Sequence, residues 1–227
     1  MRTLACVSIG ALALTSLASA DFVDLQFTGV GAGQMVKVTS PSRNGDVFAG
    51  QILYTLSNST GINLDGNWIL YCCDLGQTVS GATNTYEVLP VSSVPVNGPM
   101  GAVKAAAIGD IYAVAGGNQY SNDNDFATAF QLAIWEIVTD YIGGPASLAD
   151  ITSGSFQATM TDGNPLSAGI AGYLSFLLNA IGTTNGANVL GLGNEGLQDQ
   201  LIEVPGPGVL AAGAIGAVLT GARRRRA

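Results

Sequence analysis

The stretch DFATAFQLAIWEIVTDY, residues 125–141, is the strongest helical segment of the chain. Its apolar residues recur at steps of three and four, the spacing of one helix face: Phe126, Phe130, Ala133, Ile134, Ile137, Val138 and Tyr141. An Asn/Asp cluster at 122–125 offers an N-cap and negative charge at the helix start, and Gly143-Gly144-Pro145 ends the helix. The sequence therefore predicts a helix over 125–141.

Short strand-like segments surround this helix. Turn residues separate the predicted strands, which are 22–27, 35–38, 46–57, 68–75, 85–91 and a closing strand at 200–204, with 29–33 as a loop. Two further helices are expected at 101–115 and 165–181. This order predicts an α+β domain in which a helical block is inserted into a β-sandwich or β-barrel framework.

The two ends of the chain differ in character from the middle. Residues 1–20 have a basic start, an apolar stretch and the small-residue pattern Ala18-Ser19-Ala20, which is typical of a secretory signal peptide. Residues 204–227 contain a Pro/Gly break, an apolar run at 209–222 and Arg223 to Arg226. We expect a signal at 1–20, one domain at 21–203, and a sorting or anchor segment with a hydrophobic helix at 204–227.

The C-terminal segment resembles the PEP-CTERM sorting signal of Gram-negative bacteria, although it reads Val-Pro-Gly-Pro where that signal has Val-Pro-Glu-Pro. The resemblance implies export to the cell envelope or extracellular surface and processing by an exosortase-type protease. A plain membrane anchor is the alternative. The apolar run, at about 1.5 Å per residue, spans roughly 21 Å of a roughly 30 Å hydrocarbon core, so crossing a membrane needs help from flanking residues.

Charge and residue usage exclude several functions. Residues 21–203 hold all 16 acidic residues against three basic ones, a net charge of −13 that disfavours nucleic-acid binding. The chain has no histidine, which excludes Ser-His-Asp and Cys-His catalysis and His-containing zinc sites. The sequence predicts no metal site and no cofactor, and it offers no acid/base pair for an envelope hydrolase. We therefore expect a protein that is not an enzyme.

The remaining chemical signal lies in two short segments. The strand WILYCCDL at 68–75 carries Cys72 and Cys73, the only cysteines left after signal cleavage, and the helix carries FQLAIW at 130–135. Strand alternation places the two cysteine side chains on opposite faces, so only one of them can face Gln131. On the helix, Trp135 lies one turn beyond Gln131, which is expected to be half-buried at the margin of the apolar stripe.

These segments, Tyr-Cys-x-Asp and apolar-Gln-x-Ala-Ile-Trp, resemble the thioester domain of bacterial surface proteins. The resemblance implies that a cysteine sulfur attacks the Gln131 side-chain amide and expels ammonia to leave an internal thioester. The motif selects Cys72 for this role, with Cys73 as the less favoured candidate. Tyr71 and Trp135 would shield the bond from water, and Asp74 would orient the strand or assist proton transfer, or act only as a solvated carboxylate.

The resemblance further implies a covalent adhesin. An amine on a target protein or polymer would attack the thioester and remain attached through Gln131. The alternative is a non-covalent exported adhesion or matrix module in which Cys72 and Gln131 do not react.

Overall fold

The computed structural model describes residues 20–145 and 149–204 and contains a seven-stranded sheet and three α-helices. The fold class is α+β, as predicted. The elements in chain order are β1 (Asp21–Thr39), β2 (Asn44–Ser57), β3 (Gly66–Cys72), β4 (Asn84–Pro90), η1 (Val91–Ser93), α1 (Gly101–Ala115), η2 (Asn118–Tyr120), α2 (Asn124–Thr139), β5 (Gln157–Met160), α3 (Ala168–Leu178), β6 (Val189–Gly193) and β7 (Gln200–Glu203). Except for Ala20 and Val204, the predicted signal peptide and C-terminal segment lie outside the described residues.

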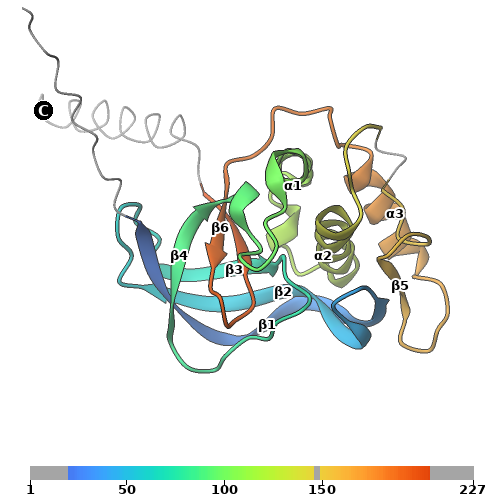
Figure 1. Cartoon of the computed structure of the whole chain (residues 1–227). Helices are drawn as coiled ribbons and strands as arrows, with labels where there is room; N and C mark the ends of the chain where they lie inside the picture. Colours follow the sequence, from blue (N-terminus) through green and yellow to red (C-terminus); the bar gives the residue numbers. More distant parts are fainter. Residues whose placement is uncertain (1–19, 146–148, 205–227) are drawn as a thin grey trace, which may run out of the picture.

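Six of these strands close into a ring. All pairs are antiparallel and run in the order β1, β2, β3, β7, β6, β4 and back to β1, while β5 pairs with the far end of the long strand β1. Figure 1 shows this barrel on one side of the molecule and the three helices packed together on the other. The framework is therefore a barrel, which removes all but short sheet edges.

The helix α2 lies at the centre of the molecule. Its side chains from Phe126 to Ile137 are all buried, because it packs against β1 and β2 on one side and against α1 and α3 on the other. Asp123 caps the start, and its Oδ1 accepts the backbone N–H groups of Asp125 (2.9 Å) and Phe126 (3.0 Å). The expected stripe with Gln131 at its margin is wrong, since Gln131 is only 1% exposed.

The strand β1 runs without a break through the segment predicted as a loop at 29–33. Its pairing with β2 shifts register between Phe27 and Gly29 and again between Val30 and Gly33, so the glycines lie at bulges inside a strand. Gly33 has φ +150°, and a Cβ there would lie 2.5 Å from the Ala49 carbonyl oxygen. Glycine is needed here because two bent strands approach each other closely.

The other differences concern element ends and two strands that were not predicted, β5 and β6. The predicted strand 68–75 ends at Cys72, and the helix predicted at 165–181 is limited to α3. β6 was not predicted because its sequence, VLGLG, is rich in glycine. A Cβ on Gly191 would lie 2.6 Å from the Val94 side chain, so glycine lets the segment after η1 pack on the barrel.

Candidate functional site: the Cys72–Gln131 contact

The structure brings Cys72 and Gln131 together. The Cys72 N–H donates to Gln131 Oε1 at 3.0 Å, and Gln131 Nε2 donates to the Cys72 carbonyl oxygen at 2.7 Å. Each residue is only 1% exposed. The carboxamide therefore lies along the backbone of the cysteine, in the place where a neighbouring strand would lie.

The strand order explains why this place is open. The pairing of β2 with β3 ends at Ile52 and Leu70, and continuing this register would place Gly50 opposite Cys72. Cys72 has no partner on β2, so β2 has left β3 at this point, although Gly50 still pairs with Gly33 on β1. The Cys72 peptide groups on this side would be buried without partners, and Gln131 satisfies both.

The thiol of Cys72 points into the barrel. Cys72 pairs with Gln200 on β7, and Gln200 pairs with the buried Leu192 on β6, so all three side chains share the interior face. The Sγ atom donates to the Asp74 carbonyl oxygen at 3.0 Å and accepts the Asp74 N–H at 3.2 Å. Burial raises the pKa of this thiol far above its ordinary value, so the resting group is neutral.

Cys73 is also buried, on the other face of the strand. Its N–H donates to the Asp199 carbonyl oxygen at 3.1 Å, and its Sγ lies 3.6 Å from the same atom. Burial raises the pKa of this thiol as well, and both cysteines are free. Of the two cysteines, the backbone that Gln131 contacts is that of Cys72.

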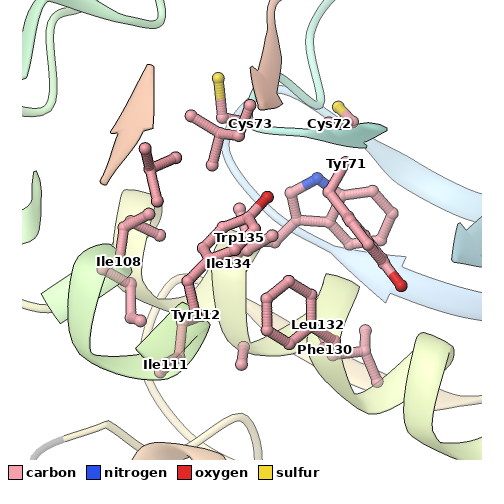
Figure 2. Close-up of a cluster of buried hydrophobic side chains, with 14 of the residues drawn as sticks. Tyr71, Cys72, Cys73, Ile108, Ile111, Tyr112, Phe130, Leu132, Ile134 and Trp135 are labelled. Atoms are coloured by element: carbon pink, nitrogen blue, oxygen red, sulfur yellow. The ribbon is translucent and has the colours of Figure 1, made fainter. Parts of the chain in front are cut away.

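Tyr71 and Trp135 lie on the helical side of this strand. The Tyr71 ring packs edge-on against Phe130 at 4.8 Å, and its hydroxyl donates to the Gln119 carbonyl oxygen at 2.6 Å. Figure 2 shows the indole of Trp135 between α2 and the strand with the two cysteines. The indole N–H has no hydrogen-bond partner among the described residues, and it is near enough to the Cys72 sulfur to lower its pKa, against the larger effect of burial.

Asp74 lies in the turn after β3, so its expected position inside the strand is wrong. Its Oδ1 accepts the Gly76 N–H at 2.7 Å, an arrangement typical of Asx turns. The carboxyl is half-buried rather than fully solvated, and burial raises its pKa. Asp74 therefore contacts Cys72 through its backbone and leaves its carboxyl near the surface.

The sequence did not indicate three buried polar residues around the site. Asp199 is 0% exposed and accepts the N–H groups of Val96 (2.5 Å) and Asn194 (2.6 Å), and burial raises its pKa to about 6. Gln51 joins the barrel to η2 by donating to the carbonyl oxygens of Gln119 and Ser121. Glu136 is buried on α2. Single polar residues of this kind carry no spacing signal in one sequence.

Comparisons with models of known protein families, with curated proteins and with solved structures gave no match to this chain. Within residues 20–145 and 149–204, no helix is both long and apolar enough to span a membrane. The same residues include no cluster of three or more His, Cys, Asp or Glu side chains able to hold a metal ion.

Proposed function

We propose that Cys72 and Gln131 form an internal thioester, and that the protein is an exported surface protein that attaches covalently to amine-bearing targets. The observation that carries this proposal is the buried, two-bond contact between the Gln131 carboxamide and the Cys72 backbone. Hydrogen bonds of a strand lie in the plane of the sheet, whereas side chains project out of it. The Cys72 sulfur hydrogen-bonds to the Asp74 backbone, so the proposed attack on the face of the amide requires it to turn from Asp74 toward Gln131.

The first stage exchanges an amide for a thioester. The sulfur attacks the Gln131 side-chain carbon, the C–N bond breaks, and the thiol proton leaves with the nitrogen as ammonia. The Cys72 N–H already donates to Gln131 Oε1, so it stabilises the negative charge that develops on this oxygen. The held geometry supplies effective concentration, which matters because the buried thiol resists deprotonation.

The second stage transfers the acyl group to a target. A primary amine attacks the same carbon, the C–S bond breaks, and Cys72 recovers its proton as a free thiol. Gln131 is then joined to the target through a secondary amide. Because each molecule reacts once, this is an attachment chemistry rather than enzymatic turnover.

Export supports this assignment from the sequence side. The resemblance of residues 1–20 to a signal peptide and of residues 204–227 to a sorting signal supports a location at the cell envelope or outside it, where the protein would meet target surfaces. Processing of the tail by an exosortase-type protease, or its retention as a membrane anchor, follows from the same proposal.

Intact-mass spectrometry of the exported protein tests the thioester. We expect a mass lower by one ammonia than the sequence requires, and no deficit in Cys72→Ala or Gln131→Ala. Cys73→Ala is the matched control, since it removes the adjacent buried sulfur and should keep the deficit. Methylamine should remove the deficit from the reactive protein and expose one new thiol. Full mass in the wild type would exclude the thioester.

A non-covalent adhesion or matrix module is the second candidate, and one observation favours it. The Gln131 amide satisfies the Cys72 N–H and C=O, which is a sufficient structural reason to keep a glutamine there. Full mass together with a stable fold would assign Gln131 this structural role alone.

A further inference from the structure

A cavity of about 330 Å³ opens beside Cys73 and Asp74, the two residues that follow Cys72. It lies between the turn after β3, the loop at 95–98 and the C-terminal half of α2. Its walls include Asp74, Leu75, Pro95, Asn97, Trp135 and Val138.

Neither Cys72 nor Gln131 lines the cavity, but residues that adjoin each of them do. Trp135, which lines the cavity, lies one helical turn beyond Gln131. Asp74, also in its wall, holds the Cys72 sulfur through its own N–H and C=O. The Trp135 indole N–H has no hydrogen-bond partner within the usual geometric limits in the described part of the chain, so turning the ring gives up only its interaction with the Cys72 sulfur.

The walls define a ligand class. Asp74 is the only acidic side chain in the wall, and none of the lining residues is basic. The indole face of Trp135 adds an attractive surface for a cation. Leu75, Pro95 and Val138 are apolar and suit a short alkyl chain. A carboxylate, an aromatic ring and apolar walls together fit an unbranched primary alkylammonium ion.

We propose that this cavity is the acceptor site, where Asp74 binds a slender primary alkylammonium group and takes its proton, and where Trp135 acts as the movable barrier to Gln131. The transfer step rests on the proposed thioester, whereas binding of the cation does not. Burial raises the pKa of the Asp74 carboxyl, which makes it a better proton acceptor than a solvated aspartate.

The step balances in atoms and charge. The ammonium gives one proton to the Asp74 carboxylate, and the neutral amine attacks the Gln131 acyl carbon. As the C–S bond breaks, a second amine proton passes to the Cys72 sulfur, leaving an amide and a thiol. Asp74 then releases its proton to solvent.

Binding is tested first in the full chain with Cys72→Ala, which cannot form a thioester. n-Butylammonium should shift the indole N–H resonance of Trp135 in a ¹⁵N-resolved spectrum, while tert-butylammonium and butyrate should not. The indole of Trp68, which donates to the Leu64 carbonyl oxygen, is the internal control. Adding Asp74→Asn should weaken n-butylammonium binding about tenfold, since a charge-assisted hydrogen bond contributes on this scale. Asp162→Asn, an exposed carboxylate in a turn outside the cavity, should leave it unchanged.

Reactivity is tested in the protein that retains Cys72. Asp74→Asn should slow loss of the thioester to n-butylamine about tenfold and leave its reaction with neutral hydroxylamine unchanged. Equal slowing of both reagents would assign Asp74 a structural role and overturn the proposal, as would an unshifted Trp135 resonance. Binding without any ammonia deficit would retain the cation site and reject the thioester, so the two failures are distinguishable.

Discussion

Gln131 stabilises the fold whether or not it reacts. Among the described residues, only its carboxamide pairs the Cys72 N–H and C=O on the side left open by β2. A buried backbone group without a partner costs about 1–3 kcal/mol. In a Cys72→Ala background, where no crosslink forms, we expect Gln131→Ala to lower the free energy of unfolding by about 4 kcal/mol in urea titrations.

Gln131→Met separates the loss of the hydrogen bonds to the Cys72 backbone from the loss of side-chain volume. Methionine fills most of the same volume but cannot pair the Cys72 backbone, so most of the destabilisation should remain. Stability equal to that of the parent would mean that water or a shifted backbone replaces the carboxamide.

Glu136 should make stability depend on pH. It is 1% exposed, its Oε1 accepts the Asp150 N–H at 2.9 Å, and its Oε2 has no partner among the described residues. Burial raises the pKa of Glu136 from 4.5 to about 7, and the neighbouring Asp140 and Asp150 carboxylates act in the same direction. The folded state thus favours the protonated form more strongly than the unfolded state does.

The sign follows from this raised pKa. Protonated Glu136 makes its full contribution to the free energy of unfolding below about pH 4.5. This contribution is lost as pH rises through about 7, a change of about 3 kcal/mol. Glu136→Gln should remove this dependence and be the more stable protein at pH 8. Asp199 titrates in the same window, so the measured quantity is the difference between wild type and Glu136→Gln across pH 4–8. Parallel curves would contradict the prediction.

At the scale of the element, α2 positions the whole site through its first turn. Asp123 caps this turn with Oδ1, and its Oδ2 accepts the Tyr173 hydroxyl of α3 at 3.0 Å. Asp123→Ala should therefore lower the free energy of unfolding by about 1–2 kcal/mol, whereas Asp123→Asn, which keeps the acceptor, should cost less. Thermal melts of both variants measure this; equal losses would show that charge at the helix start, not the cap, is what stabilises α2.

The helices were the elements that the sequence predicted best. The range 101–115 matches α1, and 125–141 matches α2 within two residues at each end. The apolar residues of α2 recur in three- and four-residue steps, and local cap residues mark its start. No local signal marks β1 as continuous, because Gly29 and Gly33 serve as bulges there and as loop residues elsewhere. Pairing with β2 decides whether these glycines form bulges within a strand or a loop between two strands.

The candidate site was predictable to a similar extent. Two short motifs indicated that Cys72 and Gln131 meet, and the structure places them in contact. The contact is made to the cysteine backbone and depends on where β2 leaves β3, which is a property of the barrel. The sequence did not predict the roles of Asp199, Gln51 and Glu136, because their partners lie in segments that are distant along the chain. Long-range pairing of single polar residues leaves no periodicity to read.

At the scale of the whole molecule, the proposed thioester would join barrel and helical layer covalently across 59 residues of chain. A crosslink closing a loop of this length stabilises a fold by about 4 kcal/mol through the lost entropy of the unfolded chain. Ammonia loss also removes the hydrogen bond from Gln131 Nε2 to the Cys72 carbonyl oxygen, and this loss lowers the stabilisation by about 1 kcal/mol. The net gain should therefore be about 3 kcal/mol.

Methylamine provides the measurement, because it opens the crosslink while leaving residue 131 an amide. Urea unfolding before and after treatment should show a loss of about 3 kcal/mol with a changed midpoint, and Cys72→Ala should show none. Barrel and helices should still unfold together afterwards, since Gln51, the Tyr71 hydroxyl and α2 itself continue to join the two layers without covalent help. If the unfolding transitions measured by far-UV circular dichroism and by Trp fluorescence no longer coincide after treatment, the prediction is wrong. The thioester, rather than packing, would then be what makes the molecule unfold as one cooperative unit.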